Sequence, residues 1–202
     1  MDTVLSVFIG IGLATACGLR VFIPLLVVSV ASHFGNLPLS PGFQWMSSTS
    51  ALIGFSVASL LEIAGYYIPW VDHLLDTIAS PAAVIAGTIV SVALMTNIDP
   101  FYKWSLAIIA GGGMAGLMQG TTVVARGAST ATTGGIANPL VSTVELIGSV
   151  LLSILAVVVP VLAVLLIALV MFFVARWFLR RRRKMAGMSK VSQSIPPAAM
   201  QA

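Results

Sequence analysis

PLVSTVELIGSVLLSILAVVVPVLAVLLIALVMFFVARWFL, residues 139–179, is an apolar run in which Glu145 and Arg176 are the only charged side chains. As one helix it would rise ~1.5 Å per residue and measure about 60 Å. That is twice the ~30 Å hydrocarbon core of a bilayer. We therefore expect two membrane spans with a break near Pro160, because proline removes an amide donor and clashes with the preceding turn.

The whole chain shares this character: 58% of its 202 residues are hydrophobic and 8% are charged. Soluble domains carry about 25% charged residues. A chain this apolar needs lipid around it, so the composition indicates an integral membrane protein of the all-α class. Four more apolar stretches lead us to expect a polytopic bundle of about six spans; they cover residues 3–31, 51–67, 81–95 and 104–118.

An internal match suggests two three-helix halves, residues 1–98 and 99–184, in inverted orientation. Small residues at a spacing of four recur 102 positions apart, and residues 68–75 resemble 159–166. Such residues let helices approach closely in lipid, and inverted repeats are common among transporters with a site near the bilayer midplane. The small residues expected at helix contacts are Gly10, Ala14, Gly18, Gly112, Gly116 and Gly120.

Basic residues gather at the end of the chain. Seven of the ten Lys and Arg follow residue 175, including the run Arg180 to Lys184, whereas all six acids precede it. A basic run beside a span marks the cytoplasmic side and attracts anionic lipid headgroups. With six spans, both termini would be cytoplasmic and the loop 33–50 would face outward. Residues 185–202 are expected to form a disordered cytoplasmic tail, and the run lacks the aromatic partners of a nucleic-acid site.

Arg20 is a charge deep inside the first apolar stretch. A charge at mid-bilayer costs at least ~2.5–3.5 kcal/mol, so Arg20 should face the bundle interior and find a partner, Glu62 or Glu145. Two interpretations stay open: an ion pair that fixes helix register, or a site for a substrate, proton or ion. Whether the first span breaks near Arg20 is open as well.

Residues 120–138 are rich in Gly, Ser and Thr and contain one charge, Arg126. They form either a plain cytoplasmic loop or an irregular, broken or re-entrant segment that lines a path and binds an anion. The candidate polar site therefore comprises Arg20, Glu62, Arg126, Asn138, Ser142 and Glu145. Asp72, His73 and Asp76 are better explained by helix capping than by metal binding, so we expect no metal and no cofactor.

Three segments together resemble a bacterial membrane family called domain of unknown function 4126: residues 18–26, residues 62–72, and residues 138–145. The resemblance covers roughly residues 4 to 170. It implies the membrane fold without an activity. The chain departs from the family at Tyr66-Tyr67, where Asp-Lys is frequent, and at Ser80-Pro81, where Arg-Pro is frequent.

These features favour a bacterial inner-membrane transporter or channel for an unknown small solute or ion. The alternative is a structural or assembly protein that binds lipid or a partner, including a second copy of itself. An enzyme is not expected, because the sequence contains no pattern typical of a nucleophile, a zinc site or a phosphate loop.

Overall fold

A computed structural model describes residues 2–68, 71–173 and 175–176, without the side chain of His73. Every secondary-structure element of the described residues is a helix, and no strand occurs among them. The chain divides into two compact units, residues 1–164 and 165–202. Within the second unit, residues 165–173 complete a helix that begins at Pro160. The basic run Arg180 to Lys184 and the tail 185–202 lie outside the described residues.

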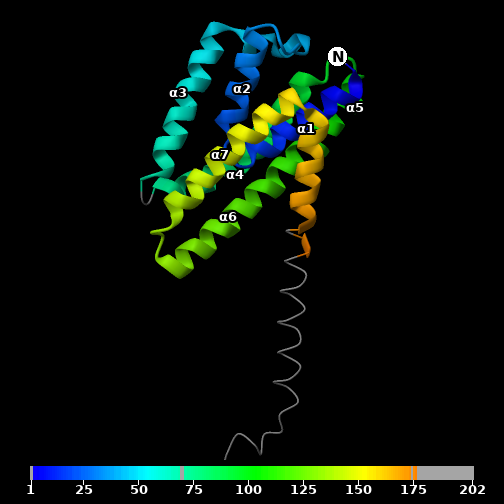
Figure 1. The fold of residues 1–202 in the computed structure, drawn as a ribbon. Helices are drawn as coiled ribbons and strands as arrows, with labels where there is room; N and C mark the ends of the chain where they lie inside the picture. Colours follow the sequence, from blue (N-terminus) through cyan, green and yellow to red (C-terminus); the bar gives the residue numbers. More distant parts are fainter. Residues whose placement is uncertain (1, 69–70, 174, 177–202) are drawn as a thin grey trace, which may run out of the picture. The chain divides into compact units, whose positions relative to one another are not determined.

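Up to Val158, the described residues of the first unit contain seven α-helices, one 3₁₀ segment and one π segment (Figure 1). They are α1 (Thr3–Cys17), α2 (Phe22–His33), η1 (Pro41–Ser47), α3 (Thr49–Tyr66), α4 (Val71–Leu94), α5 (Pro100–Leu106), η2 (Ala107–Gly112), α6 (Gly113–Thr133) and α7 (Asn138–Val158).

Four helical segments are long and apolar enough to cross a bilayer: Thr49–Tyr66, Leu74–Leu94, Pro100–Thr133 and Asn138–Val158. The membrane interpretation of the sequence therefore has structural support, but the six expected spans are not all present at this length. As expected, α7 ends at Val158, and a separate helix starts at Pro160. Residues 71–76 of the expected connector and the third span, up to Leu94, instead form one helix, α4, with Pro81 inside it.

The first apolar stretch does not cross the bundle. It breaks at residues 18–21 into α1 and α2, which span about 22 Å and 18 Å at ~1.5 Å per residue and so fall short of ~30 Å. In the middle of α1, the Gly10 carbonyl accepts a hydrogen bond from Ser91 Oγ in the last turn of α4 at 3.2 Å. After the end of α2, Ser40 N donates to the Ala93 carbonyl at 2.7 Å. The pair therefore folds as a hairpin, and we propose that it is re-entrant in the membrane.

This hairpin bears on the expected topology. Gly10 and Ser40 both contact the last turn of α4, so the N-terminal segment and the loop after His33 share one end of the bundle. We call this the Ser40 end; the opposite end, where α3 and α6 stop and α4 and α7 begin, is the Asn138 end. The sides of a membrane on which the N-terminus and the loop 33–50 lie stay a prediction.

Residues 120–133 form the last turns of α6, so both expected alternatives there, a plain loop and an irregular segment, are wrong. The helix stops at Gly134, whose φ of 65° is left-handed and disfavours residues with a Cβ. The turn that follows leads into α7 at Asn138, with Pro139 in the first helical turn, where its missing amide costs no helical hydrogen bond.

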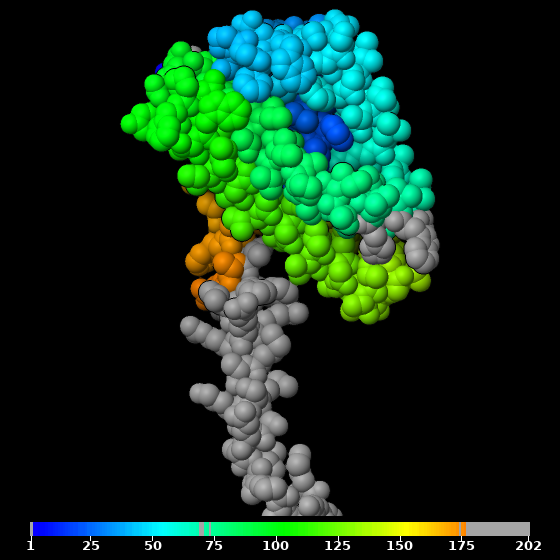
Figure 2. All heavy atoms as spheres, turned by 180° about the vertical axis from the view of Figure 1, so that it is seen from behind, coloured from blue at the N-terminus to red at the C-terminus, as the bar shows by residue number. Residues whose placement is uncertain are grey.

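The core of the first unit is α1, from Leu13 to Cys17 almost fully buried by α4, α6 and α7. From behind, Figure 2 shows blue side chains of the N-terminal helices in a hollow between the cyan α3 and the green region of α5. The expected halves 1–98 and 99–184 thus share one core, and a duplication stays a prediction about the sequence.

Close helix contacts occur at most of the expected small residues. A Cβ on Gly18 would lie 2.4 Å from the Ala115 carbonyl oxygen, and one on Gly112 would lie 2.5 Å from Thr88 Oγ1. Cβ atoms on Gly10 and Gly116 would lie 3.2 Å from Ser91 Cα and 3.1 Å from Val84 Cγ2. Ala14 is fully buried. Gly120 is exposed, with nothing of the described chain within 4 Å, because it lies on the outward face of α6.

Candidate functional site

Helix α7 is polar inside and apolar outside. Its buried face carries Asn138, Ser142, Glu145, Ser149 and Ser153, at spacings of three and four. Its exposed face carries apolar residues at the same spacings: Leu140, Val144, Ile147, Leu151, Ile154 and Val158. In lipid this arrangement turns the only carboxylate of the helix toward the bundle interior.

Glu145 binds Arg126 of α6 through both carboxylate oxygens. Arg126 Nε donates to Oε1 at 3.1 Å, and Nη2 contacts Oε2. The third guanidinium nitrogen, Nη1, lies 3.1 Å from Asp76 Oδ1 of α4. Nη1 and Asp76 Oδ1 thus form an ion pair by distance, but neither atom has a hydrogen-bond partner among the described residues.

Arg20 lies at the tip of the hairpin and its side chain is only 1% exposed. Its Nη2 donates to the Ser142 carbonyl at 2.8 Å and lies 3.6 Å from Glu145 Oε2. Nε and Nη1 have no hydrogen-bond partner among the described residues. Of the two acids considered as partners, Glu145 therefore forms the ion pair with Arg20.

Glu62 instead caps α2. Its carboxylate accepts hydrogen bonds from Val21 N at 2.7 Å and from Phe22 N at 3.0 Å. These amides lie at the beginning of the helix, where they have no helical partner and where the helix dipole favours a negative charge. A broken helix inside a membrane needs such compensation, so Glu62 stabilises the hairpin tip.

The aromatic ring of Tyr66 lies between the charged groups of three elements. The Arg20 guanidinium carbon is 3.9 Å from the ring centre, and that of Arg126 is 4.0 Å away. Each contact is a cation–π interaction worth about 0.5–2 kcal/mol, more when desolvated. Tyr66 thus contacts both buried arginines at once.

Asn138 connects these side chains to the first turn of α4. Its Nδ2 donates to Asp72 Oδ2 at 3.1 Å and to Thr130 Oγ1 at 3.2 Å. Asp72 is 6% exposed and Asn138 is 4% exposed. We define the charged cluster as Arg20, Glu62, Tyr66, Asp72, Asp76, Arg126, Asn138 and Glu145.

The predicted site residues come together in the half of the bundle that faces the Asn138 end. Glu145 is seven residues after the start of α7, and Arg126 is seven residues before the end of α6. Seven helical residues span about 10 Å. Both residues are therefore closer to the middle of their helices than to the ends, and a site at the bilayer midplane stays a prediction.

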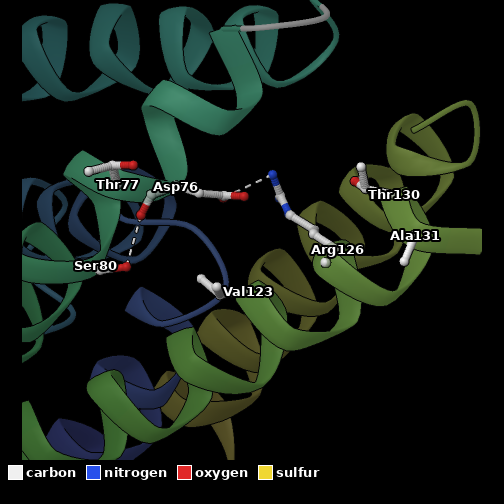
Figure 3. Close-up of a pocket in the computed structure, with 8 residues that line it drawn as sticks. Asp76, Thr77, Ser80, Val123, Arg126, Thr130 and Ala131 are labelled. Carbon is white, nitrogen blue, oxygen red and sulfur yellow. Dashed lines mark hydrogen bonds and ion pairs between the residues drawn. The ribbon is translucent and has the colours of Figure 1, made fainter. Parts of the chain in front are cut away.

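A pocket of about 750 Å³ lies beside the cluster, between α4 and α6 (Figure 3). Asp76 and Arg126 reach toward each other across it, and Ser80 donates to the Asp76 carbonyl of its own helix at 2.8 Å. The remaining lining residues are Thr77, Val123, Gly127, Thr130 and Ala131.

Three members of the cluster were not predicted: Tyr66, Asp72 and Asp76 did not enter the candidate site. Asp72 and Asp76 are four residues apart and therefore share one face of α4. The buried polar residues of α7 have similar spacings, so the spacing of the two aspartates was a signal for a polar face in the interior. Within the described side chains, which omit His73, no group of three or more His, Cys, Asp or Glu is arranged to hold a metal ion.

A family model described as a domain of unknown function (DUF4126) matches residues 7–181. This range contains the whole charged cluster and the pocket. Among curated proteins and solved structures, none matches the chain.

Proposed function

The chain belongs to the family described as domain of unknown function 4126, and we propose that it is a membrane transporter or channel for a small solute or ion, not an enzyme. The observation that carries this proposal is the Asp76–Arg126 ion pair at the wall of the pocket. Charged side chains inside a membrane bundle are costly, and they commonly mark substrate or ion pathways. A pocket of about 750 Å³ falls in the range that holds small molecules.

The re-entrant hairpin supports the same proposal. It fills the Ser40 end of the bundle with tightly packed apolar and small residues, whereas the pocket reaches the cluster from the other side. Discontinuous helices that meet inside the bundle are a recurring feature of transporter sites. A two-fold inverted repeat, with the hairpin in one half, is compatible with this arrangement and is proposed on the sequence match alone.

We propose that the protein resides in a bacterial inner membrane with the Asn138 end toward the cytoplasm. The basic residues near the C-terminus favour a cytoplasmic location for that terminus and contact with anionic lipids. The first turn of α7 lies at the Asn138 end, close to Asp72 in the first turn of α4. In this arrangement the N-terminus and the loop after His33 face outward.

The second candidate function is a structural or assembly role, and one observation favours it. Arg126 is held by Glu145 and Asp76, Glu62 caps a helix, and Arg20 binds a carbonyl. A network so extensively paired can serve to fix the register of five helical segments.

The test is current measurement on a solid-supported membrane that carries reconstituted proteoliposomes. Pulses of small amines, amino acids, carboxylates and inorganic salts are applied to the wild type and to Asp76→Asn. A transporter or channel gives a solute-dependent current that Asp76→Asn removes and that Gly120→Ala, a change at an exposed position away from the cluster, leaves intact. No current above that of empty liposomes for any solute would favour the structural role.

A further inference from the structure

We infer that the Ser40 end of the bundle carries a group of aromatic side chains that lie among the lipid headgroups of one leaflet. We call these side chains the interfacial aromatics: Phe34, Trp45, Phe101, Tyr102 and Trp104. The partner that this surface fits is the layer of headgroups and ester groups between hydrocarbon and water. The inference goes beyond the proposed function, because it holds for a transporter and for a structural protein alike.

The interfacial aromatics come from segments that are joined at the Ser40 end. One of them follows the end of α2, one lies in η1 and three lie in α5. His33 Nδ1 lies 2.8 Å from the Ser47 carbonyl oxygen, which connects the end of α2 to η1. Lys103 Nζ of α5 donates to Ser40 Oγ, directly before η1. The five rings therefore gather at one end of the bundle.

The chemistry of these side chains fits the boundary of a bilayer. All five residues are exposed, by 47% to 73%, and rings exposed to water forgo a large hydrophobic gain. The described part of the chain offers no hydrogen-bond partner to the Trp45 and Trp104 indoles or to the Tyr102 hydroxyl, and unpaired polar groups are costly in hydrocarbon. The headgroup layer accepts the rings and supplies oxygen atoms to their polar groups.

The length of the helical segment Pro100–Thr133 supports this placement independently. Its 34 residues measure about 51 Å at ~1.5 Å per residue and exceed the ~30 Å hydrocarbon core by about 20 Å. The 21 residues of α6 alone span about 31 Å. The excess is the length of α5 and η2 together, so α6 can cross the core while the rings of α5 lie outside it.

This placement sets a depth for the charged cluster. Ala93, near the end of α4, accepts the hydrogen bond from Ser40 N and therefore lies close to the boundary of the hydrocarbon core. Asp76 lies seventeen residues earlier on α4, at most about 25 Å deeper in the membrane. Because the core is ~30 Å thick, the Asp76–Arg126 ion pair lies within the thickness of the hydrocarbon.

The experiment measures how brominated lipids quench tryptophan fluorescence in proteoliposomes of the full-length chain. The chain has four tryptophans. One variant keeps Trp45 alone and another keeps Trp104 alone, with Phe at the other three positions. Bromine is placed either near the ester end of the acyl chains or near their terminal methyl groups. Because quenching requires close approach, we expect bromine near the ester end to quench both tryptophans at least about twofold more strongly.

Ile147→Trp is the matched control for depth. Ile147 lies near the middle of α7 and is 53% exposed, on the apolar face of that helix. The control carries Phe at all four native tryptophan positions. We expect bromine near the terminal methyl groups to quench this variant more strongly than bromine near the ester end.

Two outcomes of the quenching experiment would overturn the inference. Stronger quenching of Trp45 or Trp104 by bromine near the terminal methyl groups would place that side chain deep in hydrocarbon. No quenching of either one, with Ile147→Trp quenched as expected, would mean that water or a protein partner covers the surface. No quenching in any of the three variants would reject residence in the membrane together with the inference.

Nitroxide labels provide a second measurement that keeps every tryptophan. In the Cys17→Ala background, Phe34→Cys and Phe101→Cys each carry one label; the native side chains are 71% and 73% exposed, so neither change opens the core. Oxygen concentrates in hydrocarbon and a nickel chelate stays in water, so a label among the headgroups should collide with both. Collision with only one of the two reagents at both positions would overturn the inference, even where the tryptophan variants fail to fold.

Discussion

Glu145 on α7 binds Arg126 on α6 through both carboxylate oxygens, at a depth of about 10 Å from the ends of the two helices. This bidentate pair joins the two helices on either side of the turn 134–137. It also holds the arginine in place beside Asp76, so that one interaction fixes both the helix pair and the wall of the pocket.

Removing one member of this pair should destabilise the protein more than removing both. Glu145→Ala leaves Arg20 and Arg126 without their shared acid, and breaking a buried pair costs about 3–5 kcal/mol. In the double variant Arg126→Ala/Glu145→Ala, Arg20 alone of the two arginines stays buried without its acid. We therefore expect the double variant to regain part of the stability that Glu145→Ala loses.

Unfolding of the purified protein in increasing SDS gives the free energies for this cycle. Additive losses in the two single variants, with no recovery in the double variant, would show that the pair is not coupled. Lys103→Ala, on α5 and away from the cluster, is the control for loss of a positive charge.

Glu62→Ala should loosen the hairpin tip specifically. The change removes the acceptor of the Val21 and Phe22 amides, and each buried donor left unsatisfied costs about 1–3 kcal/mol. Glu62→Gln retains acceptor capacity in its amide oxygen and should lose less. Hydrogen–deuterium exchange of residues 18–25 measures the effect. Equal protection of these amides in all three proteins would contradict the capping role.

Gly18→Ala should destabilise the bundle by about 1–3 kcal/mol, the usual cost of overpacking. The new Cβ would lie 2.4 Å from the Ala115 carbonyl oxygen and 2.6 Å from Met118 Cβ, neither of which is a flexible side-chain end. Gly120→Ala is the matched control, because nothing lies within 4 Å of its Cβ position. Thermal unfolding of the two variants should separate them clearly, and similar midpoints would refute the contact between α1 and α6.

The re-entrant hairpin makes a topological prediction. In a Cys17→Ala background, which removes the only cysteine of the chain, single cysteines at Asp2 and Asn36 should react with an impermeant maleimide from the same side of the membrane. Asp2 directly precedes α1 and Asn36 follows the end of α2, so both lie at the ends of the hairpin away from its tip. Labelling from opposite sides would mean that the first apolar stretch crosses the bilayer as one span.

The ring of Tyr66 should matter more than its hydroxyl group for the interaction with both guanidiniums. Tyr66→Phe keeps the ring at 3.9 Å and 4.0 Å from the arginine carbons, whereas Tyr66→Leu removes it. With two cation–π contacts of about 0.5–2 kcal/mol each, the leucine variant should lose about 1–4 kcal/mol more. SDS unfolding that ranks the phenylalanine variant as the less stable would contradict this prediction.

The sequence by itself determined the solvent of this protein and the positions of several helix ends. With 58% hydrophobic residues, any fold exposes apolar surface, and lipid accepts it. Pro160 and the glycines after Thr133 act on their own backbone, so the breaks that they cause can be read locally. The sequence also identified Arg20 as an interior charge with Glu62 or Glu145 as its partner, because a lone charge in an apolar run is too costly to face lipid. For Arg126 it left a cytoplasmic loop and an interior site equally open.

Only the tertiary structure decided how these charges pair and where the chain turns back. Arg20 pairs with Glu145 and not with Glu62, because the Glu62 carboxylate is already bound by the Val21 and Phe22 amides. The choice between a long span and a hairpin at residues 3–31 depended on contacts that are distant in the sequence, Gly10 with Ser91 and Ser40 with Ala93. A long span and a hairpin have the same apolar periodicity. The periodicity indicates which face of a helix meets lipid, and it does not indicate the direction in which the next helix runs.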